Sequence, residues 1–486
     1  MVAGKKTLSL TRGSVVLTAS RIVTVGLAYA LNVFLARELG PELFGLLAVV
    51  ITVLAWFELF VAEALPLWVV RVIDPSGDEA LIPRSYLIAQ LALAVMLGAA
   101  LIIAAPLLAR VFGQPEDTAL FRIAALDLPL FALFVLLQGV TLGAGAYVTR
   151  AATEVGYSLT KLIGTVVLVG SGLAVLGAVL GSIAASAAGA VFALALVAWR
   201  FRGRKLVASG SARPSSARQG ALMGSAVPAV LVLSQSLALS ADLWIVKAML
   251  PAADAGVYRA AGLFAHVPIT LSSGIIWGLY AAYSDAHRRE DTARMRHYVR
   301  QTTRLLVAAG GIWIAVVLPT AASLLSVVFS ARYAIGAPVL AILSVGTGVG
   351  MLGIAMAPLL LVEGKTRGVL AGVLVLLGVE IASALLMAPR FGATGVAFAV
   401  ASVHIIGTVW AFSAMRWRLS LPLAGLLARS LLPAVAVALL AWAVRPGADA
   451  WLVAWYALFA IVYAALLFVS GAITKDDIEA IREGLH

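Results

Sequence analysis

The sequence contains no cysteine and very few charged residues. Of its 486 residues, 12% are Asp, Glu, Lys or Arg and 62% are hydrophobic, and the mean hydropathy is +1.04. The absence of cysteine excludes disulfides, thiolate catalysis and cysteine-ligated zinc or iron–sulfur sites. The scarcity of charge excludes a water-soluble protein of this length, because too little polar surface is available to cover it. The sequence therefore predicts an integral membrane protein.

Long apolar runs recur from one end of the chain to the other. A lipid-exposed backbone must satisfy its own hydrogen bonds, so such runs form helices and not open strands. Because about 20 apolar residues cross the hydrocarbon core as a helix, we predict an all-α fold with about fourteen transmembrane helices. The predicted ranges are 11–36, 43–69, 84–109, 119–145, 155–178, 180–199, 219–246, 256–284, 303–328, 335–362, 368–388, 393–415, 423–444 and 450–471.

The positive charges predict the orientation of these helices. Most of the 35 Lys and Arg fall in alternate loops, above all in 200–218 and 285–304. Basic loops stay on the cytoplasmic side, so we expect both termini to be cytoplasmic. The net charge of +12 is then explained by topology and by attraction to anionic lipid headgroups, and not by nucleic-acid binding. Arg21 interrupts what would be the apolar region of a secretory signal, so we expect the first helix to be retained.

An internal repeat organises the chain. A displacement of about 211 residues aligns the first predicted helix with the seventh, and it places Asn32 opposite Asp242 and Gly45 opposite Gly256. Six helices per repeat is an even number, so both repeats enter the membrane from the same side. We predict a first lobe at 1–205, a second lobe at 206–420, and a C-terminal helix pair with a cytoplasmic tail at 421–486.

Ionisable and polar side chains within the predicted helices are the main functional signal. A charge at this depth is costly, so each such residue is expected to face protein or a wet cavity. The first helix has one polar stripe, formed by Ser14, Thr18, Arg21, Ala28 and Asn32. Arg21 is predicted either to contact a ligand or to form an ion pair with Glu58 or Asp127. Two further polar residues share a helix face with an acid, namely Gln138 with Asp127 and Gln235 with Asp242.

The remaining buried charges allow two interpretations. Glu58, Asp127, Asp242 and Glu380 are predicted either to couple transport to an ion or to form structural pairs. Lys161 is a second candidate cation on the first lobe. By contrast, Lys247 and Arg259 lie near the predicted outer interface, where long basic side chains can reach water.

Several chemistries lack the residues they need. The sequence Gly364-Lys365-Thr366 is not a phosphate-binding loop, because Leu359 stands where that motif requires glycine. The predicted extracytoplasmic loops are too short to bind an acceptor for a membrane glycosyltransferase. The five histidines are scattered, and His266 and His404 are expected to be hydrogen-bonded packing residues. We therefore predict no enzyme activity, no metal site and no cofactor.

Three stretches resemble a known family. "FLARELGPELFGLLAVV", "EALPLWVVR" and "APRFGATGVAFAVAS" resemble the polysaccharide-transport, Wzx-like branch of the multidrug/oligosaccharidyl-lipid/polysaccharide (MOP) exporter superfamily. The resemblance implies two six-helix lobes around a central cationic cavity that opens alternately to each side. The implied cargo is an oligosaccharide on polyprenyl diphosphate, flipped to the outer leaflet of a bacterial cytoplasmic (inner) membrane for cell-surface polysaccharide. Arg21 is then the cation that contacts the diphosphate, and Lys161 a second contact.

Other members of the same superfamily remain as alternatives. A lipid II flippase would differ only in its cargo. A cation-coupled multidrug exporter would need an acidic, aromatic-lined cavity, for which Asp242 and Glu58 are candidates. A membrane scaffold would have no reason to place ionisable groups at depth. The expected partners are the lipid-linked oligosaccharide, membrane lipids, a polysaccharide polymerase and glycosyltransferases, and the flippase is expected to act as a monomer.

Overall fold

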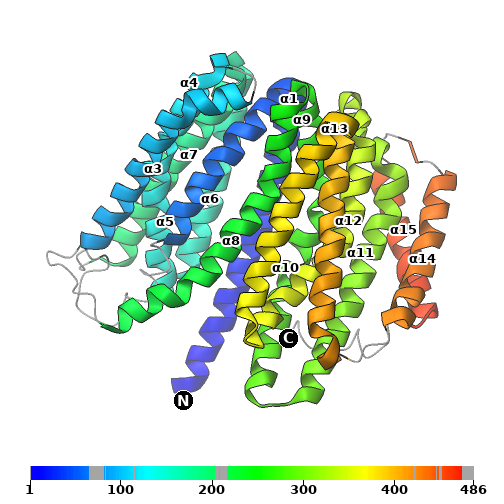
Figure 1. Cartoon of the computed structure of the whole chain (residues 1–486). Helices are drawn as coiled ribbons and strands as arrows, with labels where there is room; N and C mark the ends of the chain where they lie inside the picture. Colours follow the sequence, from blue (N-terminus) through cyan, green and yellow to red (C-terminus); the bar gives the residue numbers. More distant parts are fainter. Residues whose placement is uncertain are drawn as a thin grey trace. The chain divides into compact units, whose positions relative to one another are not determined.

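The structure, a computed structural model, is almost entirely helical over the residues that it describes (Figure 1). It describes residues 2–64, 82, 84–112, 115–202, 207, 216–419, 423–444, 446–447 and 451–472. Apart from an isolated bridge between Ile82 and Val207, these residues form no strand. The predicted all-α class is therefore confirmed. Most of the basic loop 200–218 and the tail after residue 472 lie outside the described residues.

Two compact units make up the chain. They are Met1–Ser236 and Leu237–His486, and they meet within the sequence of helix α8 (Ser216–Met249). The predicted division at 205 and 420 stays a prediction. The other helices of the first unit are α1 (Val2–Ala64), α3 (Arg84–Val111), α4 (Thr118–Ala124), α5 (Asp127–Gly143), α6 (Tyr147–Leu168) and α7 (Ala174–Arg200).

Within the first unit, α6 is the central packing partner. It lies between α1 and α7, and α5 packs against α3 and α7 (Figure 1). The sequence predicted a turn in the glycine-rich stretch 172–181, with helix limits at 178 and 180, and the backbone breaks at the first residue of that stretch, Gly172, where φ is +93°. Glycine adopts this conformation without a steric penalty. Gly177 instead lies inside α7, where a Cβ would stand 2.8 Å from the carbonyl carbon of Leu168, so its role is close helix packing.

The second unit contains longer helices. They are α9 (Ala252–Ala265), α10 (Val267–Arg288), α11 (Thr292–Val328), α12 (Ala337–Val362), α13 (Thr366–Leu419), α14 (Leu423–Val444) and α15 (Leu452–Val469). Helix α12 packs along α13 and α11, and α10 packs against α11 and α12. Asp291 caps α11 by accepting a hydrogen bond from the backbone N–H of Arg294 at 3.0 Å.

The start of each unit agrees with the predicted repeat. Helix α1 breaks at Gly40, where φ is +71°, and Pro41 follows the break. In the second unit, α8 ends at Met249 and Pro251 precedes α9. The two prolines are separated by almost the predicted displacement. Each unit therefore begins with a helix, a break at proline and a second helix.

The last two helices pack on α11. A shared apolar core joins them, formed by Ala308, Val316, Val437, Phe459, Tyr463 and neighbouring residues. The hydroxyls of Thr320 and Tyr456 lie 2.7 Å apart, and Ser323 donates a hydrogen bond to the carbonyl oxygen of Pro446 at 3.0 Å. Helices α14 and α15 lie outside the sequence repeat, yet they belong to the compact second unit.

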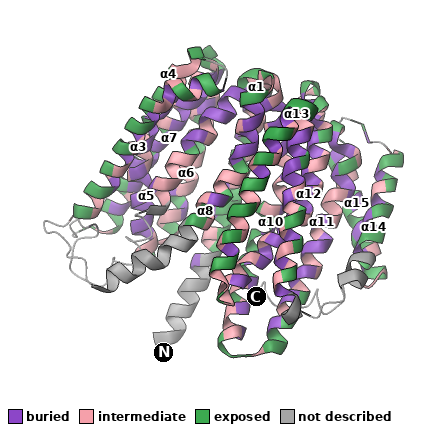
Figure 2. Cartoon of the chain, in the orientation of Figure 1, coloured by how far each residue is buried: buried purple, intermediate pink, exposed green. Residues whose placement is uncertain are grey.

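The helix surfaces suit a lipid environment. Figure 2 shows exposed and buried residues on opposite sides of several helices, and the exposed ones include Ile103 (79% exposed) and Val453 (76%). Among the described residues, 10 helices are long and apolar enough to span a membrane. Three of these, Val15–Ala62, Tyr147–Arg200 and Thr366–Met415, each contain a break and have the length for two crossings. The protein is multi-pass, and the predicted count of fourteen spans stays a prediction.

Candidate functional site

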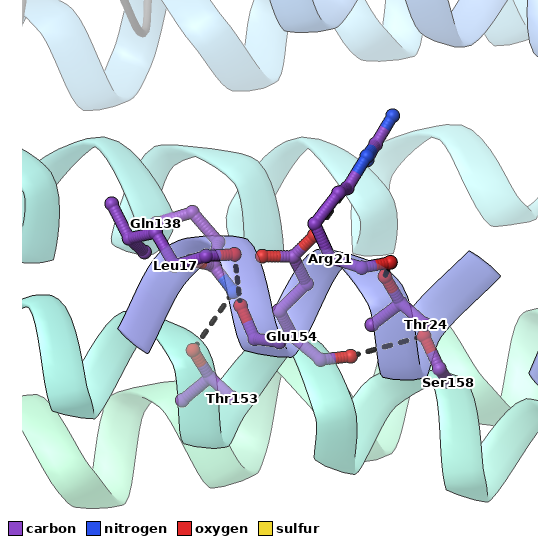
Figure 3. A network of polar contacts seen from close by, with 8 residues as sticks. Leu17, Arg21, Thr24, Gln138, Thr153, Glu154 and Ser158 are labelled. Atoms are coloured by element: carbon purple, nitrogen blue, oxygen red, sulfur yellow. Dashed lines mark hydrogen bonds and ion pairs between the residues drawn. The ribbon is translucent and has the colours of Figure 1, made fainter. Parts of the chain in front are cut away.

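Arg21 projects from the first segment of α1 beside helix α6. Its side chain is 75% exposed, and its Nη1 lies 3.7 Å from Oε1 of Glu154, which is 25% exposed (Figure 3). This separation satisfies an ion pair but is too long for a hydrogen bond. The sequence suggested Glu58 or Asp127 as the structural partner of Arg21. That suggestion is wrong, because the acid beside the guanidinium is Glu154.

The predicted helix limits explain why Glu154 was missed. The apolar run begins at 155, so the preceding residues were assigned to a loop. Helix α6 in fact begins at Tyr147. Arg150, Glu154, Ser158 and Lys161 therefore recur every three or four residues along one polar stripe of α6. This spacing was the signal in the sequence that could have identified the residue.

Gln138 lies behind this ion pair and joins α5 to α6. Its side chain is buried, and its Nε2 donates a hydrogen bond to Oγ1 of Thr153 at 2.8 Å (Figure 3). Arg150 Nη1 donates to the Gln138 carbonyl oxygen at 2.9 Å. Arg150 also interacts electrostatically with both Glu154 and Arg21. Gln138 and Arg150 thus hold the base of the site, while Arg21 stands at its open side.

The other two polar candidates occupy different environments. Asn32 is half-buried on α1, and its Nδ2 donates a hydrogen bond to the Ala28 carbonyl oxygen at 2.8 Å. Gln235 is exposed on α8, so both ends of its amide can reach solvent.

A second charged cluster lies in the first unit. Glu58 on α1, Asp127 on α5 and Lys161 on α6 interact electrostatically with one another. Lys161 Nζ lies 5.8 Å from the ring centroid of Tyr157. Asp127 is fully buried, so its carboxylate depends on these neighbours for any compensation of its charge. The sequence singled out all three charged residues, and the fold brings them together.

A third cluster lies in the second unit. Asp242 on α8 accepts a hydrogen bond from the hydroxyl of Tyr258 on α9 at 2.9 Å, and it interacts electrostatically with Glu380 on α13. His404 lies nearby on α13, and its Nδ1 is 2.9 Å from the carbonyl oxygen of Val400. The Nδ1 of His266 makes the same kind of contact with Gly262 at 2.6 Å. Both histidines are therefore hydrogen-bonded packing residues, as predicted.

Sequence reasoning missed one further cluster, which lies where α10 meets α12. Tyr283 donates a hydrogen bond to Glu363 Oε1 at 2.6 Å, and His287 Nδ1 lies 3.8 Å from the same oxygen. Tyr283 is almost fully buried, so this contact joins the C-terminal part of α10 to the C-terminal end of α12. No group of His, Asp and Glu side chains among the described residues has the arrangement of a metal site.

Apolar helices in two compact units, with ionisable side chains held among them, define a multi-pass membrane protein. The fold is that of the MOP superfamily. Comparison with the lipid II flippase MurJ in an inward closed conformation covers 93% of this chain and 98% of that chain, with a TM-score of 0.71 and 12% identity. An inward-facing multidrug resistance MATE family transporter of the MOP superfamily covers 80% of this chain and 93% of that chain, with a TM-score of 0.65 and 15% identity.

The sequence itself identifies the family. Residues 10–280 match the model of the polysaccharide biosynthesis protein family, so the chain belongs to that family. The succinoglycan biosynthesis transport protein ExoT of Rhizobium meliloti (strain 1021) is 26% identical over 339 residues, which are 68% of this chain. The match spans 64% of that relative's length. These findings confirm the resemblance to the polysaccharide-transport branch of the MOP superfamily.

Proposed function

We propose that this protein flips a polyprenyl-diphosphate-linked oligosaccharide from the cytoplasmic to the outer leaflet of a bacterial cytoplasmic membrane by alternating access. The family and its transport-protein relative support export of a polysaccharide precursor. One observation in the structure carries the choice of cargo. The guanidinium of Arg21 projects from an apolar helix, is 75% exposed and forms one loose ion pair among the residues that the structure describes.

The chemistry of the cargo explains why such a group is useful. A diphosphate moving through a membrane protein needs a cation to replace the water and counterions that it leaves behind. A guanidinium remains charged at every physiological pH and can donate paired hydrogen bonds to phosphate oxygens. Flipping breaks no covalent bond, so we expect no enzyme activity and no cofactor.

The other polar candidates receive separate roles in this proposal. The side-chain oxygen of Asn32 and the exposed amide of Gln235 can hydrogen-bond sugar hydroxyls. Gln138 positions α5 against α6 behind the ion pair. Lys161 was predicted as a second diphosphate contact, but its neighbours Glu58 and Asp127 favour the role of counter-cation to two acids.

The two acidic clusters are the proposed coupling sites. Two carboxylates close together disfavour each other's ionisation, so a cation or a proton entering such a site changes its energy. Glu58 with Asp127 and Asp242 with Glu380 are the pairs that can respond in this way. Transport would then draw on an ion gradient and would need no ATP.

Reconstitution into liposomes tests the proposal. Purified protein should move a fluorescent polyprenyl-diphosphate-linked oligosaccharide between leaflets without ATP, and Arg21→Ala should abolish this movement. Arg288→Ala is the matched control, because Arg288 is similarly exposed at 72% and pairs with Asp285, yet lies at the C-terminal end of α10, away from Arg21 in the sequence. Lipid II and a cationic drug serve as competing cargoes. Preferred movement of either one, or cargo movement that Arg21→Ala leaves unchanged, would refute the assignment.

A further inference from the structure

In the ion pair between Arg21 and Glu154, the arginine is largely exposed and the glutamate is largely enclosed. The Arg21 side chain is 75% exposed, and one Nη1 to Oε1 separation of 3.7 Å is its ion pair. A guanidinium has five donors in a fixed fork, so most of them remain available. Glu154 is more enclosed at 25% exposed. The acid is therefore held in place, whereas the guanidinium beside it is open to an incoming anion.

Glu154 also has a second arginine to hold it. Arg150 lies four residues earlier on the same face of α6 and interacts electrostatically with Glu154. Arg150 is itself anchored by its hydrogen bond to the Gln138 carbonyl oxygen at 2.9 Å. If Arg21 moves away, Glu154 still interacts with Arg150. Breaking a partly buried ion pair is usually costly because it leaves one charge unpaired. Here Glu154 still has Arg150 beside it when Arg21 moves away, so this cost is reduced.

We propose that Glu154 is an internal anion that occupies Arg21 when the site is empty and sets the anionic charge that a ligand needs to replace it. The proposal rests on the proposed function, in which Arg21 binds the diphosphate of the cargo. The carboxylate of Glu154 carries a single charge. A phosphodiester also carries one charge and gains little by replacing it. A diphosphate ester carries a charge on each phosphate and presents more acceptor oxygens to the guanidinium fork.

Such a competitor is useful because Arg21 lies in a bilayer rich in other anionic lipids. Ordinary bilayer phospholipids have phosphodiester headgroups and greatly outnumber any lipid-linked precursor. An exposed arginine on a helix surface would bind those headgroups if nothing occupied it. With Glu154 in place, the singly charged headgroup must compete against a tethered carboxylate. We therefore assign Glu154 the role of an internal competitor that lowers the occupancy of Arg21 by bulk phospholipid.

Competition binding tests this role directly. The probe is a fluorescent polyprenyl-diphosphate-linked oligosaccharide bound to purified protein, and the competitor is phosphatidylglycerol. With the probe kept well below its dissociation constant, phosphatidylglycerol should displace it from Glu154→Gln at about three- to fivefold lower concentration than from the wild type, the size of effect expected for an exposed ion pair. Glu154→Asp keeps the charge and should retain the wild-type resistance. Glu42→Gln, which removes another exposed acid of α1, should change nothing.

The outcomes separate this role from the proposed function. Arg21→Ala should lose probe binding, and the double variant with Glu154→Gln should regain none of it. If Arg21→Ala abolishes probe binding but Glu154→Gln competes like the wild type, the role of Glu154 is refuted and the proposed function stands. If Arg21→Ala binds the probe normally, both are refuted. A purely structural Glu154 would lower thermal stability in the Gln variant without changing the competition, and this result would also overturn the proposal.

Discussion

Arg304 on α11 donates two hydrogen bonds to the carbonyl oxygen of Ala472, from Nε at 3.0 Å and from Nη2 at 2.9 Å. Ala472 lies just beyond the end of α15, and its side chain belongs to the core that joins α11, α14 and α15. This side chain thus adds a charged connection to the apolar core and hydroxyl hydrogen bonds that already join α14 and α15 to α11. A guanidinium can make this two-donor contact, and an ammonium cannot reproduce its geometry.

We therefore expect Arg304→Ala to lower the free energy of unfolding by about 1–3 kcal/mol, because the carbonyl of the buried Ala472 loses charged donors. Arg304→Lys should recover part of this loss. Thermal unfolding of the purified protein in detergent measures both. Arg300, exposed one turn earlier on α11, provides the control. An Arg304→Ala protein as stable as Arg300→Ala would show that the contact contributes nothing.

Arg21 should affect transport far more than stability. Its ion pair with Glu154 is exposed on the arginine side, and exposed pairs contribute about 0–1 kcal/mol. Arg21→Ala should therefore unfold within a few degrees of the wild type while losing cargo flipping. Arg21→Lys should retain partial flipping, because it keeps the charge and loses the paired hydrogen bonds. The measurements are thermal unfolding and flipping in the same liposome preparation. A strongly destabilised Arg21→Ala protein would indicate a structural role instead.

The cluster of Glu58, Asp127 and Lys161 should behave as a coupled unit. Lys161→Met removes the cation from two acids, of which Asp127 is fully buried. We expect it to lower the free energy of unfolding by about 1–3 kcal/mol. Adding Asp127→Asn to Lys161→Met should restore much of that loss, because the surplus negative charge is removed. A double-mutant cycle on thermal unfolding measures the coupling, and additive effects would contradict it.

The predicted topology can be tested with single introduced cysteines, and no native cysteine has to be removed first because the chain has none. The positive-inside rule places the loop between α10 and α11 in the cytoplasm and the segment before α4 outside. Ala293→Cys should therefore resist an impermeant thiol reagent in intact cells, and Glu116→Cys should react with it. Both residues are exposed, so burial does not confound the result. The reverse labelling pattern would invert the topology.

Most of the fold could be predicted because the bilayer restricts it. A chain of this hydropathy must form apolar helices, and their length follows from the thickness of the hydrocarbon core. The helix limits at the break between α6 and α7 were placed too late, because several glycines stand close together in that stretch. Hydropathy does not distinguish Gly172, which turns the chain, from Gly177, which packs against Leu168.

For the candidate site, the sequence likewise predicted some features and the structure decided others. The sequence by itself determined which charged side chains cannot face lipid, because the penalty for a charge in the bilayer depends on the residue and its depth. These residues are Arg21, Glu58, Asp127, Asp242 and Glu380. Only the tertiary structure decided the partners. Glu154 meets Arg21, and Glu380 approaches Asp242, because helices remote in sequence pack side by side. Pairing across helices depends on their rotation and axial offset, which side-chain packing sets and which no single helix pattern contains.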